Sequence, residues 1–139
     1  MEHQLKGRVA LVSGGGRGIG RSICELLASH GASVAVNYRK DEDAALDTVA
    51  TIVAAGGTAR AYAASVDDAD AVALMVDQVI KDFGYIDLLV CNAGIASRGQ
   101  AVADTDPGEV MRLINTHAIN CNLVTSCWLS KVFTLMSPS

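Results

Sequence analysis

Residues 8–30 have the sequence RVALVSGGGRGIGRSICELLASH, which predicts a strand, a glycine-rich turn and a helix in succession. RVALVS is a compact apolar run, and GIGRSICELLASH carries apolar residues at helical spacing. Glycines let backbone N–H groups approach a diphosphate closely, and the helix N-terminus behind them adds positive potential. The alternative is a tight turn that binds nothing. The candidate binding residues in this stretch are Gly14, Gly16, Arg17, Gly18, Ile19 and Gly20.

The following residues alternate short β-branched runs with longer segments of helical periodicity. Strands are expected at 33–37, 58–64 and 86–91, and helices at 42–55 and 69–83. This alternation predicts βαβ units around a parallel sheet, and the apolar strands indicate that helices cover both faces. We therefore expect an α/β fold, and no linker or repeat divides the chain into more than one domain.

A further helix is expected to begin after Asp106, because Pro107 suits the first helical position and Glu109 completes a capping box. It could run on towards Met136 and would then have about 30 residues, far above the usual ~11–12. Its far part is poorly amphipathic, which suggests that this part packs on something outside the chain.

The charges after the second strand distinguish between two nicotinamide cofactors. Folds that bind NAD place an acid about 20 residues past the glycine motif, for the ribose 2′-hydroxyl. Here residues 37–40 are NYRK and the first acid is Asp41, so Arg39 and Arg17 could hold a 2′-phosphate instead. The sequence thus favours NADP(H) over NAD(H), although Arg39 and Lys40 could also be an ordinary solvated turn. The candidate residues here are Asn37, Tyr38 and Arg39.

Three motifs together resemble the short-chain dehydrogenase/reductase family, of the type that includes 3-oxoacyl-carrier-protein reductases. The first is the G-x-x-x-G-x-G spacing of the turn, and the second is NAG at residues 92–94, after the fourth strand. The third is Asn115, at the position of the family's helix asparagine. The resemblance covers about residues 5–120 and leaves an atypical tail at 120–139. The second motif adds the candidate cofactor-binding residues Asn92, Ala93 and Gly94.

The resemblance implies a Rossmann-type doubly wound parallel sheet with strand order 3-2-1-4, the later strands being absent. It also implies hydride transfer between NADP(H) and a small-molecule carbonyl or alcohol, with Asn115 in a proton relay and a homo-oligomer in the complete form. One position departs from the family pattern, because Ser65 stands where an aspartate usually precedes the adenine contact. Val66 can still pack on the ring, and Asp67 is expected to cap the next helix.

The family's Tyr-x-x-x-Lys acid/base element is missing from the sequence. The residues four positions after Tyr38, Tyr62 and Tyr85 are Glu, Val and Leu. Proton transfer needs such a group within reach of the substrate, and Asn115 is the only family catalytic residue that matches. We therefore expect residues 1–139 to form a single, incomplete dinucleotide-binding domain, the cofactor half of an oxidoreductase. The alternatives are an inactive dinucleotide-binding module and a truncated remnant.

Composition excludes several other classes of function. The chain has 11 basic and 15 acidic residues among 139 and a net charge of −4, whereas a general nucleic-acid binder needs a basic face. There is no apolar run of about 18 residues to span a membrane, and residues 1–8 carry no export signal, so a cytoplasmic location is expected. The four cysteines lack metal-site spacing and are expected to be reduced core residues.

Overall fold

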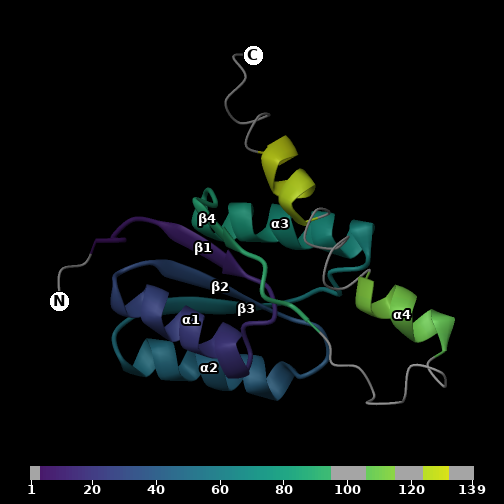
Figure 1. The fold of residues 1–139 in the computed structure, drawn as a ribbon. Coiled ribbons are helices and arrows are strands. Elements are labelled where there is room, and N and C mark those ends of the chain that lie inside the picture. The colour runs from purple at the N-terminus through teal and green to yellow at the C-terminus, as the bar shows by residue number, and fades with distance from the viewer. Residues whose placement is uncertain (1–3, 95–105, 115–123, 132–139) are drawn as a thin grey trace, which may run out of the picture.

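The computed structural model describes residues 4–94, 106–114 and 124–131. Strands alternate with helices along the chain, as the sequence predicts (Figure 1). The strands are β1 (Val9–Val12), β2 (Ser33–Tyr38), β3 (Thr58–Ala63) and β4 (Leu88–Val90). The helices are α1 (Gly18–Ser29), α2 (Glu42–Ala54), α3 (Ala69–Phe83) and α4 (Pro107–Ile114). Residues 124–131 are also helical.

The four strands are parallel and lie in the spatial order β3-β2-β1-β4, which confirms the predicted fold class and strand order. Val9 pairs with Ser33 on one side of β1, and Ala10 pairs with Leu88 on the other. Within the described residues β4 is therefore an edge strand, and its three residues are half-buried. β2 and β3 are added successively on one side of β1, whereas β4 is added on the other side.

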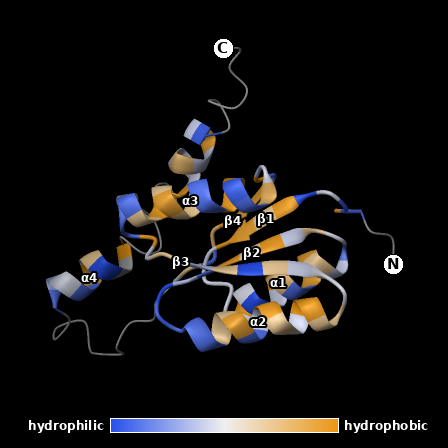
Figure 2. Cartoon of the chain, turned by 180° about the vertical axis from the view of Figure 1, so that it is seen from behind, coloured by the Kyte–Doolittle hydropathy of each residue, from blue (hydrophilic) through white to orange (hydrophobic). Residues whose placement is uncertain are grey.

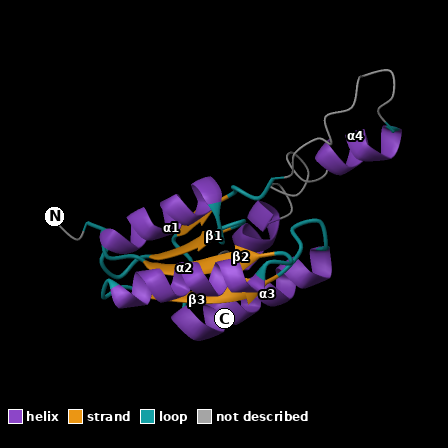
Figure 3. Ribbon diagram, turned by 90° about the horizontal axis from the view of Figure 1, so that it is seen from below, coloured by secondary structure: helices purple, strands orange, loops and turns teal. Residues whose placement is uncertain are grey.

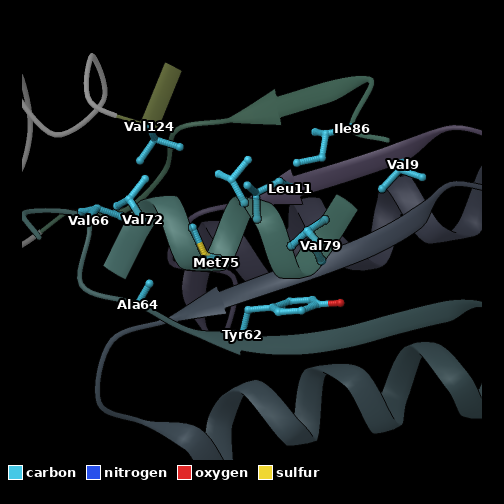
Figure 4. Packing of buried hydrophobic residues seen from close by; sticks show 12 residues of the cluster. Val9, Leu11, Tyr62, Ala64, Val66, Val72, Met75, Val79, Ile86 and Val124 are labelled. Carbon is cyan, nitrogen blue, oxygen red and sulfur yellow. The ribbon is translucent and has the colours of Figure 1, made fainter. Parts of the chain in front are cut away.

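Helices cover both faces of the sheet, as the apolar strands require (Figure 3). Successive side chains of β1 point to opposite faces, so Leu11 packs with α3 whereas Val12 packs with α1 and α2. Figure 2 shows β1 and β2 largely hydrophobic, β3 paler, and the helices striped with polar residues. Figure 4 shows the α3 side of the core, where Met75 and Val79 face Leu11 and Tyr62.

Aspartates cap α2 and α3, two of the helices that begin beside the sheet's carboxyl edge. Asp41 accepts a hydrogen bond from Ala44 N at 3.0 Å and so caps α2. Asp68 accepts bonds from the first-turn amides of α3, which begins at Ala69. The prediction that Asp67 caps this helix is wrong by one residue, because the cap must directly precede the first helical residue. Asp67 instead hydrogen-bonds the Ser65 hydroxyl.

The helical segment 124–131 packs against α3 and the residues that lead into β4. Val124 is 1% exposed within the α3 side of the core, and Lys131 Nζ lies 2.8 Å from Asp77 Oδ1 on α3. Trp128 Nε1 donates to the Ile86 carbonyl at 3.0 Å. The described part of this stretch thus packs on the chain itself, and residues 132–136, to which the expectation also applied, lie outside the described residues. In Figure 1 the segment and α4 point in different directions.

A phenol and a carboxylate join β3 to α3. Tyr62 is buried, and its hydroxyl donates to Asp82 Oδ2 at 2.7 Å. Gln78 donates to the other carboxylate oxygen at 3.0 Å, and Arg60 lies 3.5 Å from it. The hydrogen bond from Tyr62 is the main reason that the pKa of Asp82 is lowered. Burial, followed by the bond to Asp82, raises the pKa of Tyr62.

We expect Tyr62→Phe to lower the free energy of unfolding by about 1.5–3 kcal/mol at neutral pH, because a hydrogen bond to a charged group is lost. The folded-state pKa of Tyr62 lies above that of an unfolded tyrosine, about 10. The protonated phenol therefore stabilises the fold below that pH, and this contribution is lost as the pH rises further. Urea unfolding as a function of pH should show a steeper alkaline decline in the natural protein than in the variant.

Cys24 provides the internal reference for that measurement. Burial raises the pKa of its thiol to about 12, so it also destabilises the fold at alkaline pH, but equally in both proteins. Stability curves that stay parallel above pH ~10 would show that Tyr62 does not titrate differently on folding. The core position of Cys24 agrees with the sequence prediction, whereas Cys91 is exposed.

Candidate functional site

A cavity of about 450 Å³ opens at the carboxyl edge of the sheet. Its walls come from the segments that follow each of the four strands. The cavity lies at the ends of β1 and its two neighbours in the sheet. β2 lies on one side of β1, and β4 lies on the other. Open α/β sheets bind ligands in this crevice, at the switch point between strands that diverge to opposite sides. The cavity volume is in the range typical of small-molecule sites.

The glycine turn, residues 13–17, leads from β1 into α1 and forms the floor of the cavity. Gly14 has φ of +66°, which favours glycine, and an added Cβ there would lie 3.0 Å from Ala93 Cα. A Cβ at Gly20, in the first turn of α1, would collide with the Gly14 carbonyl oxygen. The chain can approach itself this closely only because these positions lack side chains.

Ser13 ties the glycine turn to the NAG element at residues 92–94. Its hydroxyl oxygen accepts hydrogen bonds from Asn92 N at 2.9 Å and Ala93 N at 3.0 Å. Asn92 Nδ2 in turn donates to the Gly14 carbonyl at 3.1 Å. Asn92 is one of the residues predicted from the sequence, whereas Ser13 is not. The available signal was a hydroxyl residue directly between an apolar strand and a glycine run.

The Asn37 side chain holds the loops on the other side of the cavity together. It is 2% exposed, and its Nδ2 donates to the carbonyls of Ala64 at 3.0 Å and Tyr62 at 3.3 Å. Its Oδ1 accepts from Gly14 N at 3.4 Å, and its backbone carbonyl accepts from Gly15 N at 3.0 Å. Asn37 lines the cavity, and its amide is directed into the protein, where it fixes the ends of β2 and β3 relative to the turn.

Basic side chains gather at one rim of the cavity. Arg39 and Lys40 are exposed there, and the Arg17 side chain is 80% exposed. Arg17 lies 3.6 Å from the Asp41 carboxylate, the acid at this rim that follows β2. Among the residues that the structure describes, Arg39 makes no ion pair. The rim therefore carries a net positive charge suited to an anion.

The structure brings most of the predicted residues together. All the predicted cofactor-binding residues except Gly18 and Gly20 line the cavity, and these two lie behind it in the first turn of α1. Ser65 and Val66 form the wall after β3. Asn115 lies outside the described residues. The cavity also has lining residues that the sequence analysis did not select, namely Lys40, Asp41, Ala44, Ala64 and Asp67.

Two titratable groups at or near the cavity are held in their neutral forms. Burial raises the pKa of the Tyr38 phenol, which stays neutral at physiological pH. Burial likewise keeps Cys24, beneath the turn, as a thiol. In the described segments, no group of three or more His, Cys, Asp or Glu residues could hold a metal ion. No helix there is long and apolar enough to cross a membrane.

Comparison with known proteins agrees with this geometry. A family profile described as short chain dehydrogenase matches residues 8–136. Versicolorin reductase stcU of Emericella nidulans is 43% identical over 115 residues, which cover 83% of this chain and 43% of that protein. Tetrahydroxynaphthalene reductase of Pyricularia oryzae is 39% identical over 114 residues, covering 81% of this chain and 40% of that protein. The chain thus spans less than half the length of these relatives.

Solved structures show the same correspondence. A short-chain dehydrogenase from Burkholderia cenocepacia, in complex with NADP, is 37% identical with a TM-score of 0.85. The match covers 91% of this chain and 51% of that one. A dehydrogenase/reductase from Sinorhizobium meliloti has a TM-score of 0.88 at 29% identity, covering 93% of this chain and 51% of that one. This chain belongs to the short-chain dehydrogenase/reductase family, whose members are oxidoreductases that bind nicotinamide dinucleotides.

Proposed function

We propose that this chain binds NADP(H) and supplies the cofactor-binding half of an oxidoreductase that transfers hydride to a small-molecule carbonyl. The observation that carries the proposal is the cavity with a glycine turn as its floor and a basic rim at the end of β2. The residues present fit the cofactor, because no side chain at Gly14 or Gly20 blocks the turn. In a complete enzyme, bound NADPH would supply the hydride.

The rim supports NADP(H) over NAD(H). A ribose 2′-phosphate needs cations, and Arg39 at this rim has no ion-pair partner among the described residues. A ribose 2′-hydroxyl would need an acid at the end of β2, and residues 38–40 there are Tyr, Arg and Lys. The Burkholderia cenocepacia structure and a 33% identical metagenomic one are NADP complexes, which agrees with this assignment.

A second candidate function is that of an inactive dinucleotide-binding module. The sequence contains no Tyr-x-x-x-Lys element to donate and accept the proton. On this proposal the chain binds cofactor as a single domain and turns nothing over by itself. A homo-oligomeric state and a cytoplasmic location stay predictions from the sequence.

Cofactor titration and a turnover assay test both proposals. Calorimetric titration of the purified chain should show saturable binding of NADPH, with weaker binding of NADH. Incubation with NADPH and a panel of β-keto substrates should show no oxidation of the cofactor. Failure to saturate with either dinucleotide would contradict cofactor binding, and steady turnover would show that the acid/base group had been overlooked.

A further inference from the structure

A buried hydroxyl on α2 lies against the middle of the glycine turn. Thr48 is 0% exposed, and its Oγ1 donates to the Gly16 carbonyl oxygen at 3.0 Å. The same Oγ1 lies 3.1 Å from the Ala44 carbonyl, the acceptor that a threonine usually reaches within its own helix. The hydroxyl has a single proton, which the Gly16 and Ala44 carbonyls share, so the shorter bond to Gly16 goes beyond the usual intrahelical bond. The contact matters for the turn.

Helix α2 contacts the glycine turn at two successive residues. Among the described residues, Thr48 is the one donor that reaches the Gly16 carbonyl. An added Cβ at Gly16 would lie 3.2 Å from Ala45 N, so the turn packs directly on the helix. At the next residue, the Arg17 guanidinium lies 3.6 Å from Asp41, the N-cap of α2. The helix thus supports the turn at Gly16 and Arg17.

The hydrogen bond from Thr48 also fixes the direction of the N–H in the peptide group between Gly16 and Arg17. Peptide groups are planar and trans, so the Gly16 C=O and the Arg17 N–H point in opposite directions. A Gly16 oxygen held towards Thr48 directs the Arg17 N–H away from α2. That N–H has no acceptor among the described residues and lies just before α1, where backbone donors and the helix dipole attract anions.

We propose that Thr48 is a positioning residue that fixes this peptide for diphosphate binding. The inference rests on the proposed function, because it assigns the glycine turn to the diphosphate of the cofactor. Thr48 itself lies outside the cavity lining and contacts two lining residues, Gly16 and Ala44, through their carbonyl oxygens. The hydroxyl thereby restricts rotation of the Gly16–Arg17 peptide group before the ligand binds. The ligand then loses less binding free energy to ordering the turn.

The binding of two small nucleotides tests the glycine turn and the basic rim separately. ADP places a diphosphate at the turn, whereas 2′-AMP places its phosphate at the basic rim, and both share adenine and ribose. Thr48→Val removes the hydroxyl and keeps the shape. We expect ADP to bind about tenfold more weakly to this variant, the effect of one lost hydrogen bond, and 2′-AMP to change by less than about twofold. Thr48→Ser should restore ADP binding.

Thr51→Val is the matched control. Thr51 lies on the same helix, donates to the Asp47 carbonyl at 2.9 Å and accepts from Arg21 on α1 at 3.1 Å, but it is exposed and does not reach the turn. Its loss should leave both affinities within about twofold, as expected for a surface substitution. If Thr48→Val does not fold, Thr48→Ala takes its place with the same expected split between ligands.

The outcomes distinguish the positioning role of Thr48 from the proposed cofactor binding. Equal weakening of ADP and 2′-AMP by the Thr48 variants would mean a merely structural role and would overturn the positioning proposal. Unchanged ADP binding would overturn it as well. Failure of the natural chain to bind either ADP or 2′-AMP would instead overturn the proposed function on which it rests.

Discussion

Replacing Gly20 with alanine is expected to abolish saturable NADPH binding and to lower the free energy of unfolding by about 3 kcal/mol or more. The new methyl group would collide with the Gly14 carbonyl oxygen and with Asn92 Nδ2, and it would lie 2.9 Å from the Gly14 carbonyl carbon. Two of these three atoms are backbone, so the turn itself has to move. The shift would also break the 3.1 Å bond from Asn92 to that carbonyl. Urea unfolding and NADPH titration measure the two effects.

Gly18→Ala separates collision from backbone strain. Gly18 has φ of +59°, and an added Cβ there would meet nothing within 4 Å. The variant should therefore lose only about 1 kcal/mol, the cost of a left-handed residue with a side chain. It should still bind NADPH. Equal losses for both variants would show that conformational strain, and not close approach of the chain to itself, makes glycine necessary in this stretch.

Replacing Arg39 with alanine is expected to weaken NADPH binding about tenfold to fiftyfold while NADH binding changes less than about twofold. Arg39 is exposed at the rim and makes no ion pair with a described residue, so its guanidinium is available to a 2′-phosphate. The measurement is the ratio of the two dissociation constants. An unchanged ratio would remove Arg39 from the 2′-phosphate site.

Two charge variants serve as controls for Arg39. Arg60→Ala removes a cation from β3, where it pairs with Asp82 away from the cavity, and should leave the ratio unchanged. Asp41→Asn removes the carboxylate beside Arg17 but keeps an oxygen that can cap α2. It should tighten NADPH binding about threefold, a typical effect for an exposed charge pair. Opposite signs for Arg39 and Asp41 would be the signature of a local anion site.

Local patterns predicted the fold and the floor of the cavity. The strand–turn–helix stretch depends on neighbouring residues, so its glycines and the order of elements follow from sequence. Periodicity does not reveal contacts between residues far apart in the chain. The hydroxyls of Ser13 and Thr48 reach residues 79 and 32 positions away, respectively. The inward direction of the Asn37 side-chain amide also depends on a distant residue, because the amide donates to the Ala64 carbonyl directly after β3.

The errors at the element ends have similar causes. β4 begins at Leu88, later than predicted, because Asp87 uses its carboxylate to accept from Val9 N at 2.8 Å. Periodicity also did not show that residues 124–131 dock on α3, because Val124 is one apolar residue in a poorly amphipathic stretch. Its burial depends on contacts with α3 and the sheet that form only in the folded chain.

The docking of residues 124–131 gives the protein an intrinsic fluorophore at a useful place. Trp128 is the sole tryptophan, and its indole is anchored to the Ile86 carbonyl at 3.0 Å. Its emission therefore reports whether this segment is attached, while far-ultraviolet circular dichroism reports the sheet and its helices. Denaturation curves that coincide by the two signals would mean that segment and sheet unfold as one cooperative unit. An earlier change in emission would identify a segment that detaches while the nucleotide cavity stays formed.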